Sequence, residues 1–300
     1  MSSTLLVTAA AAAAEVPVQP ALSLDTMVKL RNGERMPIFG LGTWLSEGDG
    51  TCKAAVKAAL KHGYRLIDTA TMYKNECDVG AALKESDAAD QTYVVSKLMP
   101  DDHGRENVLA AIDKTLADLQ VEKLDLWLMH SPSGGRVIET WKAMLEARDA
   151  GKCTSVGVSN VGPAQLEGIK AAGLEAPAVN QFELHLWNQQ REAVDYCQRE
   201  GIVIMSYCPL ARCKLFGQTG LARLAEQTGK SEAQLCIRWL LQRGFVTIPK
   251  STSEERIRAN ADVFSWELTP EQMAECDALD QEFFASNAVK AMWKPWEDVQ

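Results

Sequence analysis

Short apolar runs alternate with longer amphipathic stretches along most of this chain. The runs recur at about 38–43, 66–70, 93–98, 124–130, 154–159, 177–182, 202–207 and 246–250. Most of them begin about 23–31 residues after the previous run, which is the length of one strand-and-helix unit. The one long interval separates the seventh run from the eighth. The pattern therefore predicts eight strands joined by helical connections.

Helical periodicity fills the intervals, where apolar residues recur three and four positions apart. Several of these stretches end at a glycine, the residue that most easily adopts the left-handed conformation after a helix. These glycines are Gly63, Gly151, Gly201 and Gly244. The predicted helices include 51–63, 104–119, 137–151, 188–200 and 231–243.

Eight such units in succession predict an α/β fold, a closed (β/α)8 TIM barrel, with residues 28–300 as a single domain. The Asn32-Gly33 pair predicts a small β-hairpin ahead of the barrel. The alternative is an open, doubly wound sheet. Against it, Gly40 and Gly42 do not form a G-x-G-x-x-G motif, because position 45 is leucine.

Three segments fall outside the repeating pattern. Residues 1–27, which include the run LLVTAAAAAA, are predicted to form a flexible leader, and a cleaved signal or transit segment is the alternative. Residues 211–229 carry an additional helical stretch. The tail, 281–300, contains Trp293 and Trp296. Insertions and tails of this kind often close the mouth of a barrel.

The composition narrows the functional classes. Of the 300 residues, 46% are hydrophobic and 24% are charged, and the formal net charge is −9. An acidic chain without a basic run is a poor binder of nucleic acids or membrane surfaces. The eight cysteines form no C-x-x-C pair and lie apart from the four histidines, so we expect no metal site. Scattered cysteines fit a reducing compartment, which favours the cytoplasm.

Polar side chains follow the predicted strands at the end where a barrel carries its chemistry. Asp68 ends the second run, Lys97 the third and His130 the fourth. Alone, each could be a helix cap, a surface residue or a satisfied core residue. An apolar barrel interior would not present so many polar groups on one face without a ligand. The later runs add Ser159, Asn160, Gln181, Tyr207, Lys250 and Ser251.

Asp68, Tyr73, Lys97 and His130 together suit proton donation. A tyrosine hydroxyl is a weak acid at neutral pH, and a neighbouring ammonium is expected to lower its pKa by favouring the phenolate. A carboxylate keeps the lysine charged and in place, while a neutral histidine can orient a carbonyl group. The set predicts a site that protonates a developing alkoxide. It contains no reducing group, so it needs a separate hydride donor.

Seven short motifs carry these residues. They are Asp68-Thr-Ala-x-x-Tyr73-x-Asn75-Glu76, Ser96-Lys97, Leu128-Met-His130-Ser-Pro132, Gly157-Val-Ser-Asn160, Val179-Asn-Gln181, Ser206-Tyr-Cys-Pro-Leu-Ala-Arg212 and Ile248-Pro-Lys-Ser251. In this order, the motifs resemble those of the aldo-keto reductases over about residues 28–280. The resemblance implies an NADPH-dependent reductase of aldehydes and ketones, built on a barrel that binds NADPH without a Rossmann motif.

The resemblance also implies a role for each residue. Tyr73 would donate the proton, Lys97 and Asp68 would tune it, and His130 would orient the carbonyl group. Tyr207 would stack on the nicotinamide ring. Its carboxamide would bond to Ser159, Asn160 and Gln181, and the pyrophosphate would pass Ser206 and Leu210.

The segment that precedes the predicted helix SEERIRANADVF is rich in groups that bind anions, namely Lys250, Ser251 and Thr252. The N-terminus of a helix offers free N–H groups to an anion, and Arg256 lies one turn inside. These groups suit a 2′-phosphate better than a bare ribose, which favours NADPH over NADH. Asn260 matches the family's adenine-side asparagine. The alternative is a plain helix cap at Ser253 with Arg256 exposed.

The substrate pocket is expected to include Trp44, Ser131 and Trp293. The family often has a tryptophan where this chain has Ser131, and the following loop is short, so we expect an open site that selects weakly among carbonyl compounds. Small aldehydes, sugars, α-dicarbonyls and quinones are all candidates. As in many members of the family, a monomer is expected.

Two other functions stay open from the sequence. A barrel lysine near a tyrosine can form a Schiff base, so Lys97 could be the nucleophile of an aldolase. A non-catalytic relative could bind NADPH and serve as a regulatory or structural subunit. That role would need none of the four residues Asp68, Tyr73, Lys97 and His130.

Overall fold

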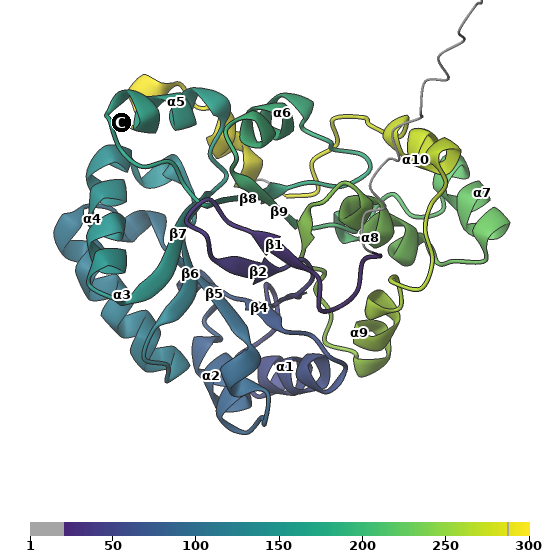
Figure 1. Cartoon of the computed structure of the whole chain (residues 1–300), viewed down its shortest axis with the longest axis horizontal. Coiled ribbons are helices and arrows are strands. Elements are labelled where there is room, and N and C mark those ends of the chain that lie inside the picture. Colours follow the sequence, from purple (N-terminus) through teal and green to yellow (C-terminus); the bar gives the residue numbers. More distant parts are fainter. Residues whose placement is uncertain (1–20, 287) are drawn as a thin grey trace, which may run out of the picture.

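Eight parallel strands form a barrel at the centre of the structure, and helices surround it (Figure 1). The computed structural model describes residues 21–286 and 288–300. Each predicted apolar run overlaps one barrel strand, so the prediction of eight strands is confirmed. The strands are β3 (Leu41–Gly42), β4 (Leu66–Asp68), β5 (Tyr93–Leu98), β6 (Leu124–Met129), β7 (Cys153–Ser159), β8 (Val179–Glu183), β9 (Val203–Tyr207) and β10 (Val246–Thr247).

The barrel is closed between its first and last strands. Neighbouring strands pair in sequence order from β3 to β10. Parallel bridges join Phe39 to Thr247 and Gly42 to Lys250 across the remaining gap. The Thr247 N–H donates to the Ile38 carbonyl over 3.0 Å, and the Gly40 N–H donates to the Thr247 carbonyl over 3.1 Å. The predicted (β/α)8 fold is therefore confirmed, and the open doubly wound sheet is wrong.

The helices follow the strands in the expected alternation. Gly63, Gly151, Gly201 and Gly244 each follow the last residues of a helix with φ between +67° and +87°, as predicted. Among the described residues, no helix is both long and apolar enough to cross a membrane. The helices are α1 (Thr51–Lys61), α2 (Glu76–Lys84), α3 (Arg105–Leu119), α4 (Val137–Asp149), α5 (Pro163–Ala171), α6 (Arg191–Arg199), α7 (Thr219–Thr228), α8 (Glu232–Gln242), α9 (Glu254–Ala261) and α10 (Pro270–Asp277).

Alternation along the strands sorts the barrel interior into an apolar layer and a polar layer. Side chains two residues apart on a strand share a face. Val95 therefore precedes Lys97 on β5, and Val179 precedes Gln181 on β8, with the apolar member of each pair in the inner cluster. The inner cluster comprises Leu30, Met36, Leu66, Val95, Leu126, Leu128, Ala178, Val179, Met205, Val246 and Ile248. The polar residues thus lie one step nearer the carboxyl ends of the strands.

The predicted hairpin lies across the opposite end of the barrel (Figure 1). It consists of β1 (Met27–Lys29) and β2 (Arg35–Pro37), which pair antiparallel. Leu30 and Met36 are buried in the inner cluster, so the hairpin closes the amino-terminal end of the barrel. The interior is consequently open only where the strands end.

Only the end of the predicted leader, 1–27, falls within the described part of the chain. Residues 1–20 lie outside it. Leu22 and Leu24 pack against the core, and β1 begins at Met27. The segment just before the hairpin is therefore attached to the barrel.

The tail passes from the pocket toward α5, where the chain ends (Figure 1). The Gln165 amide donates to the carbonyls of Ala291 and Lys294, over 2.8 and 3.2 Å. The ring of Trp296 lies so close to Gly168 that a β-carbon there would meet it at 2.5 Å. The last part of the tail is therefore anchored on the outside of the barrel.

Replacing Leu126 with alanine should lower the free energy of unfolding by about 2–5 kcal/mol, because the side chain is fully buried in the inner cluster. Urea unfolding measures this change. Met27→Ala is the control, since that side chain is 37% exposed and its loss should cost less than about 1 kcal/mol. Equal effects of the two substitutions would contradict the inner cluster.

Candidate active site

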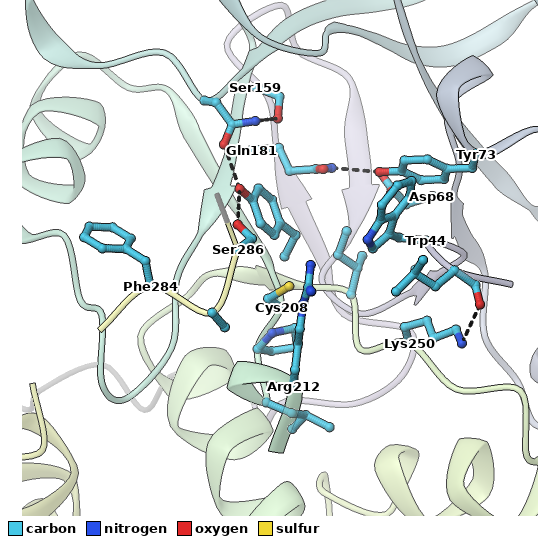
Figure 2. A pocket seen from close by; sticks show the side chains of 18 of the residues that line it. Trp44, Asp68, Tyr73, Ser159, Gln181, Cys208, Arg212, Lys250, Phe284 and Ser286 are labelled. Atoms are coloured by element: carbon cyan, nitrogen blue, oxygen red, sulfur yellow. Dashed lines mark hydrogen bonds between the residues drawn. The ribbon is translucent and has the colours of Figure 1, made fainter. Parts of the chain in front are cut away.

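A pocket of about 770 Å³ opens where the barrel strands end (Figure 2). Its walls come from several strand ends, the loop after β4, the loop after β9 and the start of the tail. Most of the residues that the sequence assigns to the site meet here. Those lining the pocket are Trp44, Asp68, Tyr73, His130, Ser159, Asn160, Gln181, Tyr207, Leu210 and Lys250.

Lys97 connects the groups at the base of the pocket. Its ammonium donates to the Asp68 carboxylate over 2.6 Å, to the Thr69 carbonyl over 2.8 Å and to the Tyr73 hydroxyl over 3.1 Å. The Gln181 amide donates to the other Asp68 oxygen over 2.7 Å. The lysine has 0% exposure and lies behind Tyr73, so it acts on the pocket only through its partners.

Tyr73 lies between an aromatic wall and the histidine. Its ring centroid is 4.8 Å from that of Trp44 and 5.7 Å from that of His130, which it meets edge to face. The residue comes from a single 3-10 turn, Thr71–Tyr73, directly after β4. The Asn75 amide fixes the facing loop by donating to the carbonyls of Thr43 and Ser46. The 3-10 turn and the hydrogen bond from Lys97 hold the tyrosine hydroxyl in this position.

Burial dominates the ionisation of this cluster. It raises the pKa of Asp68 and lowers the pKa of Lys97, while the attraction between the two opposes both shifts. The pKa of Tyr73 is raised well above its ordinary value, first by burial and then by the Asp68 charge. The expectation of a lowered tyrosine pKa is therefore wrong. The hydroxyl faces the Lys97–Asp68 ion pair and stays protonated at neutral pH.

His130 is neutral in this environment. Burial, together with the nearby Lys97 charge, lowers the pKa of its imidazole to about 3. The buried Nδ1 has no hydrogen-bond partner among the described residues. A neutral imidazole retains one N–H and one lone pair, so it can bond to a polar ligand atom. The unpaired nitrogen marks His130 as a residue that internal contacts do not fully satisfy.

A second hydrogen-bonded group forms the opposite wall. The Tyr207 hydroxyl donates to the Asn160 side-chain oxygen over 2.8 Å. The Asn160 amide donates to the His130 carbonyl over 3.0 Å and to the Ser159 hydroxyl over 3.1 Å. Asn160 adopts a left-handed backbone with φ of +57°, which turns its side chain back toward the strand end. The wall thus presents a phenol ring supported by amide groups.

Three cations line the mouth of the pocket, although the chain as a whole is acidic. They are Arg212, Lys214 and Lys250. Within the described residues, none of the three forms an ion pair with a carboxylate. Asp68 is the one acidic residue among the described residues that line the pocket, and it is already paired with Lys97. The mouth therefore offers unneutralised positive charge to an anionic ligand.

Comparison with known proteins agrees with this geometry. The sequence profile of the Aldo/keto reductase family matches residues 39–281. The glyoxal reductase of Bacillus subtilis is 43% identical over 87% of this chain and 95% of that protein. Aldo-keto reductase family 1 member A1 of Rattus norvegicus is 38% identical over 85% of this chain and 89% of that protein.

A solved structure gives the same result. The Bombyx mori aldo-keto reductase in complex with NADP superposes with a TM-score of 0.83 and 31% identity, over 92% of this chain and 99% of that one. The chain belongs to the aldo/keto reductase family. Its relatives are oxidoreductases that act on carbonyl compounds.

Some residues assigned from sequence to this aldo/keto reductase site do not line the pocket, among them Ser206, Ser131 and Trp293. Ser206 is fully buried and donates to the Leu184 carbonyl over 2.7 Å, because neighbouring residues on a strand face opposite ways. Ser131 caps a short turn by accepting from the Ser133 N–H. Trp293 lies in the anchored part of the tail with 47% exposure, away from the pocket lining.

The segment predicted to bind a 2′-phosphate lies beside the pocket. Lys250 lines the mouth, and its pKa is lowered by partial burial and by the neighbouring Arg256 charge. Arg256 is exposed on the first turn of α9. Ser253 caps that helix, which was the alternative prediction. The structure therefore has both the helix cap and the two neighbouring cations, Lys250 and Arg256. Ser251, Thr252 and Asn260 do not line the pocket, and only Thr252 is exposed.

Several residues in and behind the pocket wall escaped the sequence analysis. Phe284, Ala285 and Ser286 of the tail line the pocket, whereas the sequence pointed to the tryptophans further on. Glu183 is fully buried at the end of β8 and holds this segment. Of these residues, only Glu183 could have been predicted from the sequence, because a carboxylate on a strand two residues after Gln181 needs a polar partner.

We expect the His130 imidazole to remain neutral from pH 8 down to about pH 5, because its pKa is about 3 in the folded protein and about 6.5 in an unfolded chain. NMR titration measures this, with His130→Asn assigning the signal. The contribution of His130 to stability is present above about pH 6.5 and is lost as the pH falls toward 3. Titration of this residue near pH 6.5 would contradict the assignment.

Proposed function

We propose that this chain reduces aldehydes and ketones to alcohols with NADPH. The observation that carries the proposal is the position of the Lys97 ammonium, within hydrogen-bond distance of both Asp68 and the Tyr73 hydroxyl. The hydroxyl stands at the base of a pocket that His130 also lines. This arrangement supports proton donation to a carbonyl oxygen.

The residues present fit NADPH. The Tyr207 ring offers a flat surface, and Ser159, Asn160 and Gln181 beside it offer groups that complement a carboxamide. The unneutralised cations Arg212, Lys214 and Lys250 complement phosphate charge at the mouth. When bound, NADPH supplies the hydride that reduces the carbonyl carbon.

The chain itself would supply the proton. Because the pKa of Tyr73 is raised, its hydroxyl is protonated at neutral pH and can donate to the oxygen as negative charge develops there. Lys97 would stabilise the phenolate that remains, and Asp68 keeps the lysine charged. The neutral His130 would orient the carbonyl oxygen toward Tyr73. Hydrogen bonds within the chain fix these groups relative to one another, which lowers the cost of reorganisation.

The pocket rim favours an uncharged substrate with an apolar part. Four of the six large hydrophobic residues that are exposed in the described chain line this pocket. They are Trp44, Leu45, Met72 and Phe284. If the cations at the mouth hold the cofactor's phosphates, the remaining surface offers a substrate mainly apolar contacts. We therefore propose neutral aldehydes and ketones as the substrate class.

An aldolase that uses Lys97 is not supported. A Schiff base needs a free amine that can reach a substrate carbonyl. The Lys97 nitrogen donates to three acceptors, and the side chain is fully buried. A purely binding role is also disfavoured, because binding NADPH would need none of the four residues Asp68, Tyr73, Lys97 and His130.

Tyr73→Phe should lower kcat by about 10²- to 10⁴-fold, because it removes the proposed proton donor. Loss of reduced-cofactor absorbance with a panel of aldehydes measures kcat, and quenching of tryptophan fluorescence measures NADPH affinity, which should change by less than about 3-fold. Tyr93→Phe is the matched control, since that buried hydroxyl has no partner among the described residues. Near-normal turnover by Tyr73→Phe would remove the assignment.

Arg256→Ala should raise the KM for NADPH by about 5- to 50-fold and leave that for NADH nearly unchanged, because one charge-assisted contact to the 2′-phosphate is lost. Initial rates with both cofactors measure the preference. Arg258→Ala serves as control, since it removes an exposed arginine from the same helix. An equal effect of Arg256→Ala on both cofactors would argue against a 2′-phosphate site.

A further inference from the structure

The start of the tail forms one side of the pocket and is fixed there by a single carboxylate. Figure 2 places Phe284 and Ser286 beside the pocket, on a segment that comes from the end of the chain. Glu183, at the end of β8, accepts hydrogen bonds from the backbone N–H groups of Ala285 and Ser286, the latter over 2.9 Å. It also accepts from the Ser286 hydroxyl and from His185, the latter over 3.0 Å.

Glu183 is fully buried, and burial alone would raise its pKa. The hydrogen bonds from His185, Ser286 and Ala285 outweigh that effect and hold its pKa below the ordinary value. Glu183 is therefore ionised at neutral pH and acts only as an acceptor. A buried carboxylate with four donors fixes the positions of all of them.

The protons available to the neighbouring hydroxyl groups can be counted. Ser286 has one proton, and its donation to the Glu183 carboxylate leaves the serine oxygen free to accept. Tyr207 also has one proton but two acceptors within reach. They are the Asn160 side-chain oxygen, at 2.8 Å, and the Ser286 oxygen, at 3.4 Å (Figure 2). In the structure the closer Asn160 takes it.

We propose that Ser286, oriented by Glu183, is a second acceptor for the Tyr207 hydroxyl and keeps the tyrosine in position when a bound cofactor also draws on the Asn160 oxygen. This inference rests on the proposed function, which places the amide of the nicotinamide at Asn160. An amide N–H that donates to Asn160 would share that oxygen, which has two lone pairs, with the Tyr207 hydroxyl. Ser286 then keeps the buried hydroxyl satisfied and the ring in position. Ser286 and Glu183 are thus positioning residues for cofactor binding.

Three variants test the proposal with binding as the readout. Ser286→Ala removes the acceptor but keeps both backbone bonds from the tail to Glu183. Ser286→Thr restores a hydroxyl at the same place. Ser265→Ala is the matched control, because Ser265 is exposed on the loop after α9. NADPH and NADP⁺ dissociation constants come from fluorescence quenching, and thermal unfolding reports the fold.

We expect Ser286→Ala to weaken NADPH binding by about 2- to 12-fold, the range that one neutral hydrogen bond supplies. Its Tm without cofactor should fall by about 2–4 °C, because Glu183 loses one of its four donors. Ser286→Thr should restore both the affinity and the Tm. Unchanged affinity in Ser286→Ala would overturn the proposal. So would weaker binding that Ser286→Thr does not rescue and that accompanies a lower Tm, because that result indicates a structural role. If the unaltered chain does not bind NADPH, the proposed function fails and this inference fails with it.

Discussion

The rest of this structure depends on one fully buried lysine, Lys97. Removing an ammonium from water costs several kcal/mol, which is tolerated only if charge and hydrogen bonds compensate. Lys97 meets that requirement with Asp68 from β4, the Thr69 carbonyl and the Tyr73 hydroxyl. Asp68 in turn accepts from Gln181 on β8. Satisfying one cation therefore fixes the relative positions of two strands on opposite sides of the barrel and of the residue proposed to donate the proton.

In the barrel, the position of a residue along its strand determines how deep its side chain lies in the interior. Because side chains alternate, the residue two places after an apolar interior residue lies one layer nearer the mouth. Val95 and Lys97, or Val179 and Gln181, follow this rule, as do Met205 and Tyr207. The hairpin residues Leu30 and Met36 cover the other end. The polar layer thus rests on a packed apolar layer, and burial in this part of the barrel shifts the pKa values of Tyr73 and His130.

This regularity also explains what the sequence could predict. The eight strands, their order and most pocket residues follow from local periodicity, so Asp68, Tyr73, His130 and Tyr207 were found without coordinates. Ser206 lies outside the pocket lining because its neighbour Tyr207, not Ser206, faces inward. The tail could not be placed, since the bonds between Glu183 and Ser286 join residues 103 positions apart and no periodicity encodes them. The direction of the Tyr73 pKa shift depended on burial, which composition does not reveal.

The closure between β3 and β10 has a dynamic consequence. Both strands are two residues long, whereas β5 and β6 have six residues each. Few backbone hydrogen bonds therefore hold this seam, which makes it the natural place for the barrel to open transiently and for amide exchange to be fastest among the strands. Gly42, Ile248 and Lys250 lie along the seam and also line the pocket. A ligand that contacts both strands would hold them together, so a filled pocket would slow the transient opening of the barrel.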